Sequence, residues 1–266
     1  MACFTWPARR TCGRALRQSR EAGAHRILQR AQRAPLRGRT GSKRYNQMMA
    51  ALRRPFFFRQ LVLSTLLVWL ASLGGAWAAT APVLLIVGDS ISAGYGLASG
   101  KGWVTLLTQR LADAKSPFQV VNASISGDTT AGGLARLPAL LGQHKPAVVV
   151  IELGGNDALR GGDLNATRAN LDAMIAESKR AHAKVLVLGM QLPPNYGTAY
   201  VKRFSAVFTD AAAANKVPVV PYLFDGFGED LDQFQPDRIH PTAAAQPKIL
   251  DNVWPALAPL LKQAER

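Results

Sequence analysis

The stretch Val83–Ser90 reads VLLIVGDS, an unbroken apolar run that ends in a glycine, an acid and a serine. A strand that is apolar at every position, rather than at alternate positions, is typical of a strand buried on both faces. Such strands form the interior of a parallel sheet that helices cover on both sides. The polar residues Gly88, Asp89 and Ser90 are therefore expected at the carboxyl end of a buried strand.

Further apolar runs recur along the chain, with room for a helix between each pair. Strands are predicted at Val83–Val87, Gln119–Ile125, Ala147–Leu153, Lys184–Met190 and Val217–Leu223. Helices are predicted at Gly102–Ala114, Leu134–Gln143, Leu164–His182, Tyr200–Ala214 and Thr242–Gln263. Strands that alternate with helices imply right-handed crossovers. We expect an α/β fold over residues 80–266, a three-layer α/β/α sandwich with a five-stranded parallel sheet.

The basic charge of the chain is confined to its first third. Residues 1–47 hold 12 Lys and Arg and one acid, and residues 48–79 hold three Arg and no acid. Residues 80–266 are left with 17 basic and 16 acidic residues, and this balance removes the case for a nucleic-acid partner. Cys3 and Cys12 lie upstream as well, so residues 80–266 contain no disulfide, thiolate nucleophile or cysteine metal site.

Residues 48–79 have the pattern of a secretory signal peptide. Arginines precede the apolar run Leu61–Leu73, and Ala76-Trp77-Ala78 places small residues where signal peptidase reads them. The run is shorter than the roughly 20 residues of a membrane span, although an uncleaved anchor is the alternative. We predict cleavage near Ala78, a periplasmic or secreted protein and no stable membrane anchor. Residues 1–47 are expected to be a disordered extension, or to lie upstream of the true start.

Ser90 is the first candidate for chemistry, because ligands bind beyond the carboxyl ends of strands in such sheets. Its alternative role is to cap a helix. A serine nucleophile needs a base to accept its proton. His25 lies in the basic extension, and His144 and His182 are expected at helix ends on the opposite edge of the sheet. His240 closes the loop after the fifth strand and is therefore the candidate base.

Three other polar residues are candidates for supporting roles. Asp237 lies three residues before His240, so its carboxylate can hold the imidazole Nδ1–H, or it can be a cap residue. Gly127 and Asn156 follow the second and third strands and offer a backbone N–H and a side-chain amide to an oxyanion. Glycine and asparagine are also common in ordinary turns. Asp157 is expected to be structural.

Four sequence blocks together resemble the SGNH (GDSL-type) hydrolase family. In order, they are Gly88-Asp89-Ser90, Gly127 within NASISGDT, Gly154-Gly155-Asn156-Asp157, and Asp237-x-x-His240-Pro241. The resemblance covers residues 82–262. It is closest to the periplasmic multifunctional subgroup of acyl-CoA thioesterase I, lysophospholipase and arylesterase, and it implies a flavodoxin-like fold.

The resemblance implies a role for each matched residue. Ser90 is similar to the family nucleophile, His240 to the base and Asp237 to the acid that orients the base. The N–H groups of Ser90 and Gly127 and the side chain of Asn156 match the oxyanion hole. The family needs no metal or organic cofactor, and its substrate is a small acyl ester or thioester. This chain departs from the subgroup at Arg238, where relatives more often have glycine, and in a slightly shorter loop after Met190.

The sequence leaves alternatives for the residues that contact the substrate and for the function. Apolar residues near the carboxyl edge either line an acyl groove or pack the core, namely Leu159, Met190, Leu192 and Tyr196. We expect a monomer. The alternatives to an esterase or thioesterase are a carbohydrate deacetylase and a non-catalytic periplasmic protein that binds lipid or glycan. The presence of all five catalytic groups argues against the binding protein.

Overall fold

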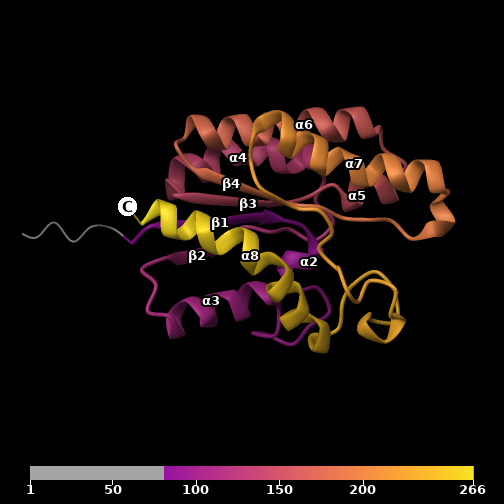
Figure 1. Cartoon of the computed structure of the whole chain (residues 1–266), viewed down its shortest axis with the longest axis horizontal. Coiled ribbons are helices and arrows are strands. Elements are labelled where there is room, and N and C mark those ends of the chain that lie inside the picture. The colour runs from indigo at the N-terminus through magenta and orange to yellow at the C-terminus, as the bar shows by residue number, and fades with distance from the viewer. Residues whose placement is uncertain (1–80, 266) are drawn as a thin grey trace, which may run out of the picture. The chain divides into compact units, whose positions relative to one another are not determined.

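Five parallel strands form the central sheet of the computed structural model, which describes residues 81–265 (Figure 1). The strands are β1 (Val83–Gly88), β2 (Gln119–Asn122), β3 (Val148–Glu152), β4 (Lys184–Leu188) and β5 (Val219–Val220). Their order across the sheet is β2-β1-β3-β4-β5. The predicted five-stranded parallel sheet is confirmed. The predictions for residues 1–47 and for the signal peptide at 48–79 lie outside the described residues.

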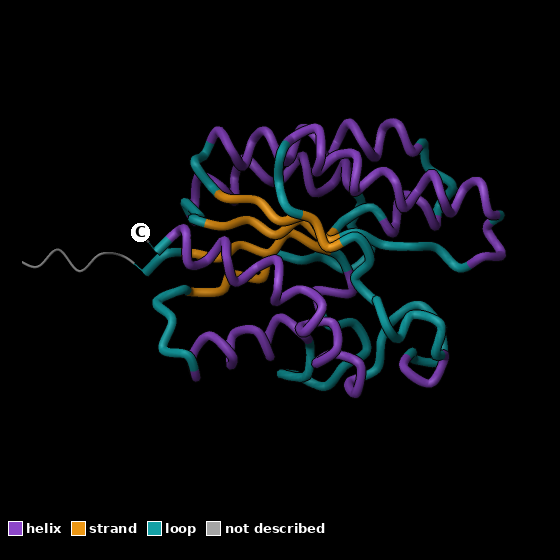
Figure 2. Tube along the Cα trace, in the orientation of Figure 1, coloured by secondary structure: helices purple, strands orange, loops and turns teal. Residues whose placement is uncertain are grey.

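Helices cover both faces of the sheet. They are α2 (Ser90–Ala93), α3 (Trp103–Asp113), α4 (Thr130–His144), α5 (Gly155–Leu159), α6 (Leu164–Arg180), α7 (Thr198–Asn215) and α8 (Gln246–Ala264), with 3-10 turns η1 (Pro194–Tyr196), η2 (Leu231–Gln233) and η3 (Ala243–Ala245). Helices α4, α6 and α7 form one layer, and α3 and α8 form the other (Figure 1). Figure 2 shows the strands between these two layers. The three-layer α/β/α sandwich is therefore confirmed.

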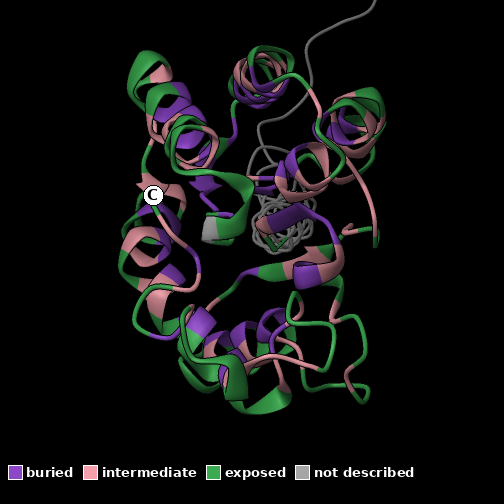
Figure 3. Ribbon diagram, turned by 90° about the vertical axis from the view of Figure 1, so that its right-hand side faces the viewer, coloured by how far each residue is buried: buried purple, intermediate pink, exposed green. Residues whose placement is uncertain are grey.

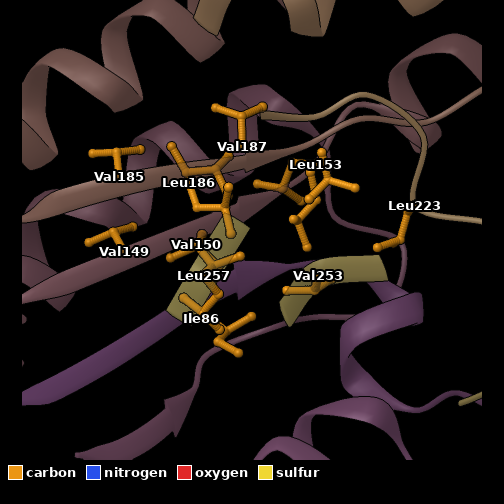
Figure 4. Close-up of a cluster of buried hydrophobic side chains, with 14 of the residues drawn as sticks. Ile86, Val149, Val150, Leu153, Val185, Leu186, Val187, Leu223, Val253 and Leu257 are labelled. Atoms are coloured by element: carbon orange, nitrogen blue, oxygen red, sulfur yellow. The ribbon is translucent and has the colours of Figure 1, made fainter. Parts of the chain in front are cut away.

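The core is built on β1 and β3. Leu84–Val87 and Val148–Ile151 are completely buried, as the unbroken apolar runs predict. Val253 and Leu257 of α8 lie against this part of the sheet (Figure 4). Figure 3 views the molecule from the right-hand side of Figure 1 and shows the buried faces of the helices turned inward. Complete burial of one such aliphatic side chain stabilises the fold by roughly 1.5–3 kcal/mol.

The edge strands are shorter than predicted. Strand β2 ends at Asn122 rather than Ile125, and its residues are only partly buried because it has one neighbour, β1. The Asn122 side chain donates to the carbonyl of Ser92 and accepts from the N–H of Ser124, which turns the chain out of the sheet. Strand β5 has only two residues. Pairing partners, rather than apolar runs, thus set the strand lengths at the edges.

Two helices begin four residues away from their predicted starts. Helix α4 begins at Thr130 instead of Leu134, because Thr129 accepts from the Gly132 N–H at the helix start. Pro138 consequently lies inside this helix. The final helix begins at Gln246, after η3, so Pro247 occupies the first turn, where a missing N–H breaks no hydrogen bond. The short helices α2 and α5 were not predicted.

The order of the strands determines where the site lies. β1 pairs with β2 on one side and with β3 on the other, so the chain adds strands first on one side of β1 and then on the other. Sheets of this kind bind ligands at the place where the order of the strands reverses. Ser90 follows β1 and Asn156 follows β3, so both lie at this point. In Figure 1 the carboxyl edge is on the right, where α2 and α5 are labelled. Between residues 81 and 265, no helix has both the length and the apolar character needed to cross a membrane.

Candidate active site

Ser90 and His240 meet at the carboxyl edge. The Ser90 Oγ lies 2.8 Å from the His240 Nε2, although the residues are 150 positions apart. Ser90 is the first residue of α2, and the Asp89 side chain caps that helix by accepting from the Ile91 N–H. Gly94 ends α2 in the left-handed conformation, which confines the helix to four residues. The serine is thus held in a short turn between β1 and the rest of the chain.

Asp237 contacts His240 with both carboxylate oxygens. Its Oδ2 lies 2.6 Å from the His240 Nδ1, while its Oδ1 accepts from the N–H groups of Ile239 and His240. Burial raises the pKa of the Asp237 carboxyl, but these hydrogen bonds outweigh burial and lower the pKa below 3.8. An ionised Asp237 holds the proton on Nδ1, so that Nε2 is free to accept the proton of Ser90.

The neighbours of His240 also restrain its ring. The ring of Tyr95 packs against the imidazole with a centroid distance of 4.5 Å. Gln235 donates its N–H to the His240 carbonyl and its side-chain amide to the Tyr95 carbonyl. Sequence patterns did not indicate Tyr95 or Gln235, because Tyr95 is far in sequence from His240 and Gln235 is far in sequence from Tyr95.

Amide groups suited to an oxyanion follow β1, β2 and β3 at the same edge of the sheet as Ser90. Within residues 81–265, the backbone N–H groups of Ser90 and Gly127 have no hydrogen-bond acceptor. Gly127 has φ 80°, a conformation that favours glycine, and Arg160 donates to its carbonyl at 2.9 Å. The Asn156 Nδ2 donates to the Asp89 Oδ2 at 3.0 Å, which leaves its second N–H available. The described structure therefore leaves three donors for an oxyanion.

Two carboxyl groups are buried behind the serine. Asp89 is 2% exposed and Glu152 is fully buried. Burial raises the pKa of Asp89 to about 6. Burial, together with the nearby Asp89 charge, raises the pKa of Glu152 well above 4.5. The sequence analysis did not single out Glu152, although one acid in an otherwise apolar strand is a signal, since buried charges need a partner or a proton.

The remaining predicted residues have different surroundings. Met190 and Leu192 are each 7% exposed and belong to the core, and Leu159 is partly buried against it. Tyr196, which is 40% exposed, is the most open of the four residues predicted to contact substrate. Asp157 accepts from the N–H and the hydroxyl of Thr130, which agrees with the structural role expected for it. In the described range, no cluster of three or more His, Cys, Asp or Glu could hold a metal ion.

Several known proteins are similar to this chain in sequence. Residues 86–246 match the GDSL-like Lipase/Acylhydrolase family. The chain is 56% identical to Esterase TesA of Pseudomonas aeruginosa over 183 residues, which cover 69% of this chain and 91% of that protein. It is 44% identical over 184 residues to Thioesterase 1/protease 1/lysophospholipase L1 of Escherichia coli strain K12, with 69% and 87% covered.

A solved structure has the same fold. The psychrotrophic esterase EstA from Pseudoalteromonas sp., inhibited by monoethylphosphonate, aligns with a TM-score of 0.64 and 38% identity. The alignment covers 68% of this chain and 98% of that chain. Together with the sequence matches, this likeness confirms the resemblance that the four sequence blocks predicted.

Proposed function

The chain belongs to the GDSL-like lipase/acylhydrolase family and is a serine hydrolase of acyl esters, and we propose that Ser90 is its nucleophile, His240 its general base and Asp237 the acid that orients the base. The contact between the Ser90 Oγ and the His240 Nε2 is the observation that carries this proposal. A hydroxyl becomes an effective nucleophile when a base within hydrogen-bond reach accepts its proton.

The reaction follows from the positions of these groups. His240 takes the Ser90 proton as Oγ attacks the carbonyl carbon of the substrate. The resulting oxyanion accepts hydrogen bonds from the N–H groups of Ser90 and Gly127 and from the Asn156 amide. The carbonyl re-forms, His240 protonates the leaving alcohol or thiol, and an acyl group remains on Ser90. Water, deprotonated by His240, then releases the acid, and the proton returns to Ser90.

A fluorophosphonate probe tests the nucleophile. The probe should form one covalent bond to the Ser90 Oγ with loss of fluoride, and the Ser90→Ala variant should remain unlabelled. Ser116→Ala, which changes a partly exposed serine just before β2, at the edge of the sheet opposite to Ser90, is the matched control and should be labelled like the unaltered protein. Labelling of the Ser90→Ala variant at another serine, with retained ester hydrolysis, would refute the assignment.

The substrate class is inferred from the relatives. We propose that the protein cleaves aryl esters, acyl thioesters and lysophospholipids, the activities in the names of the Escherichia coli relative and of a 41% identical arylesterase of Vibrio mimicus. Tyr196 and Leu159 are proposed to contact the acyl chain, with Met190 and Leu192 packed beneath them. A panel of acyl-CoA, lysophospholipid, aryl ester and acetylated sugar substrates tests this proposal. Preference for the acetylated sugar would favour the deacetylase alternative.

The cellular location is a separate proposal. The arginine-rich start, the apolar run and the small residues near Ala78 support export to the periplasm or medium, with cleavage near Ala79. We also propose that the mature protein is a monomer. Fractionation followed by N-terminal sequencing tests the first point, and light scattering of the exported protein tests the second. A mature protein that begins far upstream of Ala78 would contradict the predicted cleavage.

A further inference from the structure

The proposed mechanism gives no role to Glu152, the last residue of β3. Glu152 pairs in register with Gly88 of β1 and lies completely inside the protein. Its Oε2 accepts three hydrogen bonds, from the N–H groups of Asp89 and Ser92 at 3.2 Å each and from the Ser92 hydroxyl at 2.6 Å. One carboxyl oxygen thus holds the turn that carries Ser90.

The packing around this carboxyl group leaves it little freedom. A Cβ at position 88 would lie 2.6 Å from the Glu152 Oε2 and 2.8 Å from the Ser92 side chain, so a residue larger than glycine would displace the contact. The turn and the buried acid are therefore matched in shape as well as in hydrogen bonding.

The second oxygen of Glu152 indicates that the group carries a proton. Among residues 81–265, Oε1 has no hydrogen-bond partner, and an ionised carboxylate would bury this oxygen unpaired. Burial and the Asp89 charge both favour the neutral acid. With its proton, Glu152 can donate a hydrogen bond to the neighbouring Asp89 carboxylate. The two acids then form one carboxylic acid and one carboxylate.

Asp89 connects this pair to the oxyanion site. Its Oδ1 accepts from the Ile91 N–H at 3.0 Å, and its Oδ2 accepts from the Asn156 side chain at 3.0 Å. The Asp89 carboxylate binds one N–H of the Asn156 side-chain amide and so determines the direction in which the second N–H of that amide points. The other titratable or charged groups nearby are His240 and Arg136, which reaches the Gly88 carbonyl at 3.5 Å.

We propose that Asp89, supported by a protonated Glu152, is a positioning residue that orients the Asn156 amide toward the oxyanion. The proposal rests on the proposed function, because it assumes that the oxyanion forms beside Ser90. Asp89 does not touch the substrate, and it acts through Asn156. The side-chain amide is thereby held in place before the reaction, when it costs least to orient.

Asp89→Asn tests the connection to Asn156. The new side chain has one oxygen and one NH₂ group in place of two oxygens. Either the NH₂ group faces the Asn156 amide, where both groups are donors, or it faces the Ile91 N–H, and that hydrogen bond is lost. We expect kcat to fall about 10²–10³-fold, the loss typical of one missing oxyanion donor, with a much smaller change in KM. In an Asn156→Ala background, the same change should lower kcat less than about fivefold, because residues that act as a unit are not additive.

Glu152 variants test the proton. Glu152→Gln keeps an oxygen for the three donors and an N–H for Asp89, so it should retain most of kcat. Glu152→Leu keeps the volume but removes the acceptor, and its kcat should fall as in Asp89→Asn. Ser178→Ala, which changes another fully buried polar side chain far from Ser90, is the matched control and should keep wild-type kinetics.

The outcomes separate this proposal from the proposed function. Absence of fluorophosphonate labelling at Ser90 in the unaltered protein would overturn the proposed function. If labelling is normal but Asp89→Asn and Asn156→Ala multiply their effects on kcat, Asp89 does not act through Asn156, and the positioning proposal fails. A Glu152→Gln variant that folds, as judged by circular dichroism, but is as slow as Glu152→Leu would show that Glu152 must be ionised, and would also overturn the proposal.

Discussion

The two edges of the sheet carry polar residues of different kinds. At the amino edge, Lys115, Lys145, His182 and Lys216 follow the ends of helices in the left-handed conformation, with φ between 44° and 63°. Positive charge is favourable there because helix carboxyl ends carry partial negative charge. At the carboxyl edge, Ser90, Asp237 and His240 instead contact one another. Polar side chains that follow helices serve the helices, whereas those that follow strands are free to form a site.

One cavity of the protein lies away from the hydrogen-bonded residues at the carboxyl edge. A cavity of about 730 Å³ lies at the amino edge, lined by three lysines, His182 and apolar side chains of α8. Its lining does not include Ser90, Asp237 or His240. Within residues 81–265, hydrogen bonds between distant residues mark the carboxyl edge, whereas this cavity lies away from them.

The sharpest test of this comparison changes one histidine at each edge. His240→Ala removes the base, and we expect kcat for p-nitrophenyl ester hydrolysis to fall at least about 10⁴-fold. His182→Ala removes a histidine that only ends a helix, and kcat should stay within about twofold. The comparison of edges would break down if the two variants lost similar activity while remaining folded.

Buried acids at the carboxyl edge should also make the stability of the protein depend on pH. Glu152 and Asp89 have raised pKa values, so they favour folding at low pH, and this contribution is lost as the pH rises above the unfolded values near 4. Above about pH 6 Asp89 is ionised in the folded protein as well, whereas Glu152, as long as it stays protonated, continues to lose its contribution to the free energy of unfolding, by at most about 1.4 kcal/mol per pH unit.

Urea titrations between pH 6 and 8 measure this effect. The stability of Glu152→Gln relative to the unaltered protein should increase with pH, because glutamine takes up no proton on folding. Ser178→Ala, which changes a buried group that does not titrate, should differ from the unaltered protein by a constant amount. Parallel curves for the unaltered protein and Glu152→Gln would mean that Glu152 is ionised.

A smaller effect is expected from the arginines of the two edges. Arg160 holds the Gly127 carbonyl and so fixes the turn whose N–H is proposed to bind the oxyanion. Arg160→Ala should lower kcat about tenfold, since small misplacements of such groups are costly. Arg180 at the end of α6 pairs with Glu177, and Arg180→Ala should leave kcat unchanged. Equal kinetics for the two variants would remove Arg160 from the site.

The smallest effect concerns left-handed residues. Arg238, between Asp237 and His240, has φ 57°, which costs roughly 1–2 kcal/mol for a residue other than glycine. Arg238→Gly should raise the free energy of unfolding by about 0.5–1 kcal/mol after the greater chain entropy of glycine is subtracted. Lys216→Gly relieves similar strain but loses a favourable charge at a helix end, so it should gain less. Thermal melts of both variants measure the difference.

Sequence patterns were sufficient for the main elements of the fold, and they picked out Ser90, Asp237 and His240, which the structure joins by hydrogen bonds. Leu84–Val87 and Val148–Ile151 are buried on both faces because no polar residue interrupts either run. His240 was separable from His144 and His182 because it follows a strand, whereas they lie at the ends of helices. Arg238 has a left-handed φ, and this conformation gives a physical reason why relatives more often have glycine at the position.

Other features depended on contacts that no local pattern contains. Met190 and Leu192 share the apolar character of surface groove residues, and only packing decided that both are nearly buried. Tyr95 reaches His240 across 145 positions of the chain. Strand β2 stops at Asn122 because its single partner and a side-chain hydrogen bond end it there.

By itself, the sequence determined the parallel α/β order and the chemical groups that follow each strand, because apolar runs and residue types are local properties. Only the tertiary structure decided that Glu152 lies behind Asp89 and that Asp89 holds Asn156. The protonation of a buried acid depends on the water it has lost and on the donors around it. Those donors come from positions 60 to 67 residues away, so they exist only once the chain has folded.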